Sequence, residues 1–293
     1  MFCLKQTFHL FHSVPLSLFI KKSKSIYKVG QFMPNFELWY LFPAGIVIAA
    51  LATSSGISGA NFWIPVYLIG LKVSPNTGFC LALFTMFFGF GSAVLKNMRS
   101  KTINWYLVNQ YLKVCLPASL IGGYLSTMAP QGLLVAIFGI FVLAYGSYLL
   151  YKGCTQVIEK VERHNKIFWG MGLIAGVLKG LLVTGLGKLI LPCYINHQRI
   201  KHHSEAVGTT VTILFIVNLC AFIGRVNSDL LNTLSNERSF IISVLFWVVP
   251  SVIIGGQIGP HINQKLSKIR LCIFMGGLLI FVGGLTFLRA FPI

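Results

Sequence analysis

Long apolar runs separated by short polar segments dominate the chain, and none of the runs shows a period of two. Two runs, Trp105–Leu125 and Phe168–Ile195, include lysines. Six others carry no Asp, Glu, Lys or Arg: Leu38–Leu71, Gly78–Leu95, Gln131–Tyr151, Ala206–Ile223, Phe240–Ile262 and Leu271–Leu288. A helix crosses the hydrocarbon core with about 20 residues. The pattern therefore predicts an all-α, polytopic membrane protein with about eight transmembrane helices.

The composition agrees with a membrane protein and excludes several other classes. Hydrophobic residues make up 55% and charged residues 10% of the 293 residues, whereas soluble domains carry about 25% charged residues. The net charge of +18 is spread between apolar runs, so a nucleic-acid partner is not expected. The seven cysteines form no CxxC pair, which argues against a disulfide framework and a zinc site. We expect them to be packing residues.

The two halves of the chain resemble each other. Pro117–Leu125 and Pro250–Ile258 share a proline, an isoleucine and a Gly-Gly pair at the same spacing. Gly56–Pro65 and Gly185–Pro192 are both small-residue tracts that end in proline. Four spans per half is an even number, which predicts that both halves enter from the same side, related by an axis along the membrane normal. The expected parts are an extension at 1–37, four-helix repeats at 38–151 and 168–293, and a polar linker at 152–167.

The segment that opens each half is too long for one perpendicular span. Leu38–Leu71 has 34 residues and would extend about 50 Å as a helix, and Phe168–Ile195 has 28. Broken helices at corresponding positions of two halves are typical of a transporter's binding site; close packing of helices through small residues is the alternative. The residues expected at the breaks are Gly56, Gly59, Pro65, Gly185, Gly187 and Pro192.

Charges inside the predicted spans have one sign. Lys113, Lys179 and Lys188 lie inside them, whereas no Asp or Glu does. A charge at the bilayer centre costs about 2.5–3.5 kcal/mol on the insertion scale, so we expect a cavity that accepts an anion. Alternatively, the lysines snorkel to an interface. Asn61 takes the place of Lys188 in the first half. Hydroxyl groups expected at the site, unless they bond back to helix carbonyls, are Ser58, Thr184, Thr209 and Thr210.

Basic residues in the loops predict the orientation. With eight straight spans, 15 basic residues fall on the side of the N-terminus, the 96–104, 152–167 and 224–239 loops and the C-terminus, against 6 on the other side. Cytoplasmic loops are enriched in Lys and Arg. Both termini are therefore predicted to lie in the cytoplasm, with the protein in the cytoplasmic membrane.

The order of these motifs resembles the TauE/SafE family of membrane transporters, also called the sulfite exporter family. Neither tract has the family's full glycine triplet, and a lysine stands at 188, so the chain resembles a distant member. The resemblance implies transport of small organosulfur or other anionic compounds across the cytoplasmic membrane. It covers about residues 40–290 and rests on Gly56–Pro65, Thr184–Pro192, Ala206–Thr210, Pro117–Gly123 and Pro250–Gly256.

Together these observations predict a secondary transporter for a small anionic solute that works by alternating access. The alternatives are an intramembrane enzyme, although the HExxH and GxSxG motifs are absent, and a membrane scaffold without transport. No cofactor or metal is expected. The expected partners are the lipid bilayer and the anion, while the sequence leaves open whether the protein forms a homo-oligomer.

Overall fold

The structure is a computed structural model that describes residues 35–155, 166–195, 197–265 and 268–290. Most of the expected 1–37 extension and 152–167 linker lies outside these residues. The regular elements of the described part are all helices, and five of them are long and apolar enough to cross a membrane. This confirms an all-helical membrane protein.

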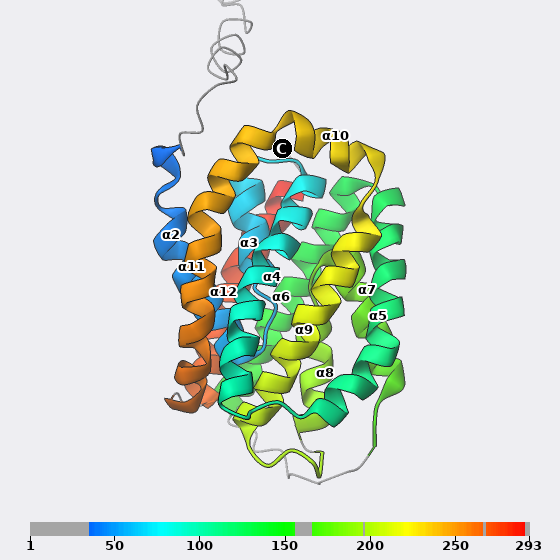
Figure 1. Cartoon of the computed structure of the whole chain (residues 1–293), viewed down its shortest axis with the longest axis vertical. Coiled ribbons are helices and arrows are strands. Elements are labelled where there is room, and N and C mark those ends of the chain that lie inside the picture. Colours follow the sequence, from blue (N-terminus) through cyan, green and yellow to red (C-terminus); the bar gives the residue numbers. More distant parts are fainter. Residues whose placement is uncertain (1–34, 156–165, 196, 266–267, 291–293) are drawn as a thin grey trace, which may run out of the picture. The chain divides into compact units, whose positions relative to one another are not determined.

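Figure 1 shows the helices in sequence order, and most of them coincide with a predicted apolar run. The first half contains η1 (Phe36–Leu38), α2 (Leu41–Ser55), α3 (Ala60–Pro65), η2 (Val66–Gly70), α4 (Pro75–Arg99), α5 (Trp105–Met128) and α6 (Gln131–Thr155). The second half contains α7 (Trp169–Leu182), α8 (Leu186–Ile195), α9 (His203–Arg225), α10 (Ser228–Asn236), α11 (Arg238–Lys265) and α12 (Lys268–Ala290).

Polar caps fix where several helices begin. Ser74 accepts a hydrogen bond from the Thr77 N–H at 3.3 Å, with Pro75 at the first position of α4. Asn104 and Asn227 cap α5 and α10 in the same way, which satisfies amide groups that lack a partner inside the helix. Helix α10 lies where the sequence analysis expects a loop, because a short, largely polar helix leaves no apolar run.

The first overlong segment forms a hairpin instead of one bent span. Helix α2 ends at Gly56, whose φ of 68° lies in the left-handed region. A Cβ on Gly45 would lie 3.4 Å from the Trp63 ring, and one on Gly59 would lie 3.3 Å from the Ala52 side chain. In a continuous helix Gly45 and Trp63 would be about 27 Å apart. Helix α3 therefore folds back beside α2.

The second overlong segment also folds back. Helix α7 ends at Val183 with φ 60°, and Gly185 has φ 95°. A Cβ on Gly185 would lie 3.3 Å from the Leu178 Cβ, and α8 then returns toward the end of the bundle where α7 begins (Figure 1). The predicted breaks are thus present in both halves, and each break is a turn between two helices.

The hairpins reverse the expected loop arrangement. The Asn104 side-chain amide, in the loop before α5, donates to the Arg199 carbonyl at 3.0 Å and to the Glu205 carboxylate at 3.2 Å. With eight straight spans, the 96–104 and 196–202 loops would lie on opposite sides of the membrane, and this prediction is wrong. Eight straight spans count each overlong segment as one crossing, whereas a hairpin returns to the side from which it entered.

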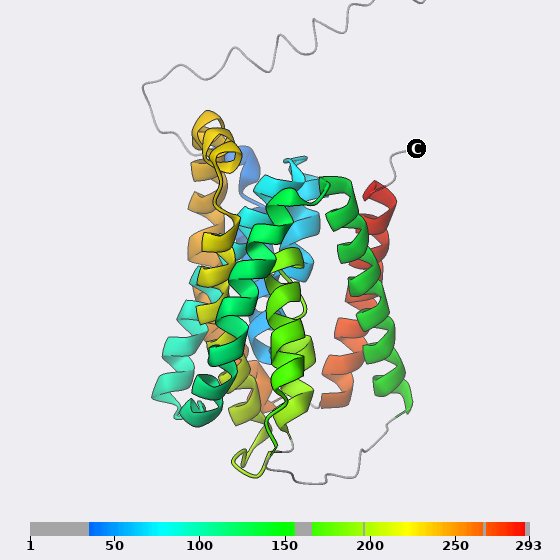
Figure 2. The ribbon, with the colours of Figure 1, turned by 90° about the vertical axis from the view of Figure 1, so that its right-hand side faces the viewer.

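The second half therefore runs in the direction opposite to the first. Helices α2, α4 and α11 start at one end of the bundle, and α5, α7 and α9 start at the other (Figure 1). The α2–α3 hairpin enters from the end that carries Asn35, and the α7–α8 hairpin enters from the opposite end. Helices α6 and α12 pack along each other, antiparallel, with Gly139 beside Phe287, and α12 ends on the side of Asn35 (Figure 2).

Candidate functional site

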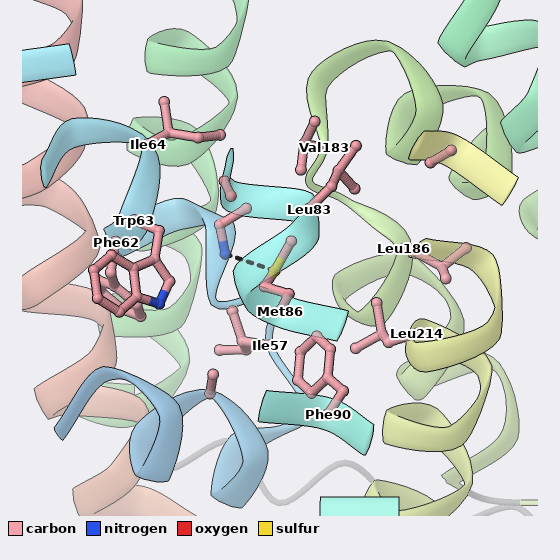
Figure 3. Packing of buried hydrophobic residues seen from close by; sticks show 14 of the residues in the cluster. Ile57, Phe62, Trp63, Ile64, Leu83, Met86, Phe90, Val183, Leu186 and Leu214 are labelled. Atoms are coloured by element: carbon pink, nitrogen blue, oxygen red, sulfur yellow. Dashed lines mark hydrogen bonds between the residues drawn. The ribbon is translucent and has the colours of Figure 1, made fainter. Parts of the chain in front are cut away.

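The turns of the two hairpins meet inside the bundle. The Ser58 hydroxyl donates to the Val183 carbonyl at 3.2 Å, and the Thr184 hydroxyl donates to the Asn61 side-chain oxygen at 2.5 Å. All four residues are fully buried. Irregular backbone at membrane depth is tolerated where protein surrounds it. Buried apolar side chains pack in this part of the bundle, as Figure 3 shows: Ile57, Leu83, Met86, Val183, Leu186 and Leu214.

A thioether completes the turn of the first hairpin. The Met86 sulfur lies 3.0 Å from the Ala60 N–H and 3.3 Å from the Ser58 hydroxyl, and Figure 3 shows Met86 between α4 and the hairpin turn. The Ala60 amide is at the start of α3, where no helix carbonyl is available to it. Because a thioether is a weak acceptor, the Ala60 N–H remains available to a stronger acceptor.

Lys179 lies at this contact, in the last turn of α7. It is fully buried, and its ammonium group donates to the Ser58 hydroxyl at 3.1 Å and to the Val183 carbonyl at 2.8 Å. Both acceptors are neutral. Carbonyl groups at a helix C-terminus carry partial negative charge, so Lys179 stabilises the end of α7, and neither of its two hydrogen-bond acceptors is a carboxylate.

Lys188 lies in the first turn of α8 and is only 3% exposed. Its ammonium group is 3.3 Å from the Asn61 side-chain oxygen. Two rings from α6 complete its surroundings, with the Tyr145 centroid at 4.5 Å and the Phe141 centroid at 5.0 Å. Cation–π contacts of this kind are worth about 2 kcal/mol or more when desolvated. The ammonium group thus rests on neutral partners that an anion can replace.

Arg225 adds a third buried cation that the sequence analysis missed. It is the last residue of α9 and is fully buried, although the loop count places it in the 224–239 loop. Its guanidinium group donates to the Gly180 carbonyl at 3.1 Å and the Leu181 carbonyl at 2.6 Å. The sequence does allow Arg225 to be placed in the span, because a helix that continues two residues beyond the Ala206–Ile223 run includes Arg225.

The remaining predicted residues lie on α9, α5, α3 and α8. The Thr209 hydroxyl donates back to the Glu205 carbonyl at 2.7 Å and accepts from the Asn104 N–H. The Thr210 hydroxyl donates to the Ala206 carbonyl. Lys113 is exposed on the surface of α5. Pro65 and Pro192 lie within α3 and α8, and π-helical η2 follows Pro65.

The site therefore holds three buried basic side chains, and their hydrogen-bond acceptors among the described residues are all neutral. The glycines at the turns allow this close approach, because a Cβ on Gly187 would collide with the Gly56 carbonyl oxygen. In the part of the chain that the structure describes, no group of three His, Cys, Asp or Glu side chains is placed to hold a metal ion. The chemistry that this arrangement offers is electrostatic binding of an anion.

Comparison with known proteins gives a family. Residues 41–286 match the family described as sulfite exporter TauE/SafE. A probable membrane transporter protein of Methanocaldococcus jannaschii is 24% identical over 263 residues, which cover 84% of this chain and 95% of the relative. Another from Bacillus subtilis is 21% identical over 264 residues, covering 82% and 93%. No solved structure matches significantly. The chain belongs to the sulfite exporter TauE/SafE family.

Proposed function

We propose that this protein is a secondary transporter that moves a small anion, and that the anion binds where the two hairpin turns meet. The observation that carries the proposal is the pair Lys179 and Lys188, which are buried with only neutral acceptors. Buried charges in membrane proteins normally have partners or a functional role. An anion is the partner that would balance this charge.

The proposed residues divide into two groups. Lys188, Asn61 and Thr184 form one connected set through the Asn61 side-chain oxygen. Lys179 and Ser58 form the other. We propose that an anion displaces Lys188 from Asn61 and from the α6 rings and binds between the two sets. Thr209, Thr210 and Lys113 have no part in this proposal.

The helix directions suggest how access alternates. We propose two inverted repeats, each with one hairpin and three membrane crossings, related by an axis in the membrane plane. Asn61 and Lys188 are 127 residues apart, as are Pro65 and Pro192, which supports their equivalence in the two repeats. One hairpin enters from each side of the membrane. Each hairpin therefore provides a movable element that can open the site toward its own side.

The corrected loops also change the proposed orientation. Among the residues with described side chains, only Lys72 and Arg238 are basic and outside the core at the end that carries Asn35. The opposite end has seven such residues: Lys96, Arg99, Lys101, Lys152, Lys166, Arg199 and Lys201. By the positive-inside rule, we propose that the basic end faces the cytoplasm and that Asn35 and the end of α12 face outward across a cytoplasmic membrane.

The family description favours sulfur-containing anions as substrates. The proposal is tested by purifying the protein, reconstituting it in liposomes and measuring flux of sulfite, thiosulfate, small sulfonates and small carboxylates. Matched small organic cations serve as the control. Saturable flux of at least one anion, absent from protein-free liposomes, is expected. Flux of the cations alone, or of none of these solutes, would contradict the proposal.

A further inference from the structure

Asn218 is a buried amide without a hydrogen-bond partner. It lies within α9 and is 1% exposed. Neither its side-chain nitrogen nor its side-chain oxygen meets a donor or acceptor in the described part of the chain. Leaving a buried polar group unsatisfied costs about 1–3 kcal/mol. Such a group in the middle of a transmembrane helix is therefore an observation that a bound ligand would explain.

The helix directs Asn218 toward the α7–α8 hairpin. Leu214, one turn earlier, lies 3.3 Å from the position of a Cβ on Gly187, at the start of α8. Arg225, two turns later, contacts the end of α7. Positions 214, 218 and 225 fall within about 40° of each other around a helix with 3.6 residues per turn. Asn218 thus lies on the face of α9 that contacts both helices of the hairpin.

Arg225 offers a second unused donor on the same face. Its Nε and Nη2 atoms bond to α7, and its guanidinium group lies 5.0 Å from the Phe79 ring. Its Nη1 atom is buried and has no partner among the described residues. A helical side chain leans toward the N-terminus of its helix, so the guanidinium group reaches back along α9 toward Asn218.

We propose that Asn218 and Arg225 form a second anion-binding position, next to the site of Lys179 and Lys188 and nearer the end that carries Asn35. The anion's oxygens accept hydrogen bonds from the Asn218 side-chain nitrogen and from Arg225 Nη1. This inference rests on the proposed function, and it adds a second position that the anion occupies on its route toward that end. The ligand class is a small oxyanion such as sulfite or sulfate.

Variants of Asn218 distinguish an amide that binds an anion from a buried amide that is unsatisfied and binds nothing. Replacing Asn218 with Leu removes the unsatisfied atoms at similar volume, so thermal stability without anion is expected to rise. In the same variant, the stabilisation of the protein by sulfite or sulfate should fall, and the KM for anion flux should rise about 10-fold or more. N218D should reduce flux further, because its carboxylate repels the anion. N232D on the exposed surface of α10 is the matched control.

Measuring sulfate binding by its effect on the melting temperature, without measuring transport, separates the proposal of a second anion position from the proposal of transport. In Lys188→Ala protein, sulfate should still raise the melting temperature, and adding Asn218→Leu should remove that effect. If wild-type protein carries no anion flux but shows this Asn218-dependent stabilisation, the second position stands and the transport proposal fails. If Asn218→Leu raises thermal stability and leaves both flux and the sulfate effect unchanged, the second position is overturned.

Discussion

The side-chain oxygen of Asn61 lies 3.3 Å from the ammonium group of Lys188, although the two residues belong to hairpins that enter the bundle from opposite ends. This contact joins the halves of the protein at the site itself. A movement of either hairpin changes the distance between the amide and the ammonium group. In the proposed function, anion binding and hairpin position are therefore coupled through these two residues.

The α6 rings are expected to set how firmly Lys188 is held. Tyr145→Leu removes the nearer ring, whereas Tyr145→Phe keeps its face. A desolvated cation–π contact of about 2 kcal/mol corresponds to roughly 30-fold in an equilibrium constant. We expect Tyr145→Leu to change the KM for the transported anion by up to that factor and Tyr145→Phe by less than about 3-fold. Equal KM values for both variants would show that the ring contact has no role.

Close approach of the hairpin turns depends on Gly187. In Gly187→Ala the new methyl group collides with the Gly56 carbonyl oxygen, and overpacking of this kind costs about 1–3 kcal/mol. Thermal unfolding in detergent should show a lower melting temperature and the flux assay a loss of activity. Gly277 in α12 is the control, since a Cβ there meets no atom within 4 Å. Gly277→Ala should leave stability unchanged or slightly higher.

Single cysteines test the hairpins directly. In a background without native cysteines, K101C and K201C should react with a membrane-impermeant thiol reagent from the same side, because Asn104 bonds to Arg199. K72C, in the loop after the first hairpin, should react from the opposite side. All three positions are exposed. Labelling of positions 101 and 201 from opposite sides would contradict the hairpins and favour eight straight spans.

The proposed orientation is tested separately. A reporter enzyme that is active only outside the cytoplasm, fused after Ile293, should be active, because the more basic end of the bundle is proposed to face inward. A fusion at Lys101 is expected to be inactive. An inactive C-terminal fusion together with an active fusion at Lys101 would reverse the orientation and leave the fold unchanged.

The sequence indicated where the two overlong segments break but not the direction in which each chain segment continues. Glycine tracts located both breaks, and the absence of internal carboxylates identified Lys179 and Lys188 as unusual. Hydropathy measures the length of an apolar segment and carries no information on its direction, so a hairpin and a long tilted span look alike. Only contacts between distant residues, such as Trp63 beside Gly45, reveal the return.

Other errors came from the ends and faces of helices. Arg225 lies two residues beyond an apolar run, and the sequence gives no sign that the end of α7 accepts its hydrogen bonds. Lys113 lies in an apolar run, yet it is exposed on α5. The buried neighbours Tyr111 and Cys115 are four residues apart and define the opposite face. Helical periodicity could therefore have separated Lys113 from the buried lysines.

The most direct test of the account is anion flux into proteoliposomes that contain Lys188→Ala, compared with wild-type protein and with Lys113→Ala at equal reconstitution. The anion used is the one that wild-type protein transports best. We predict that Lys188→Ala lowers the flux at limiting anion concentration by at least about 10-fold, as expected for loss of a charged hydrogen-bond donor. Lys113→Ala should retain wild-type flux. Full flux through correctly folded Lys188→Ala protein would contradict the account.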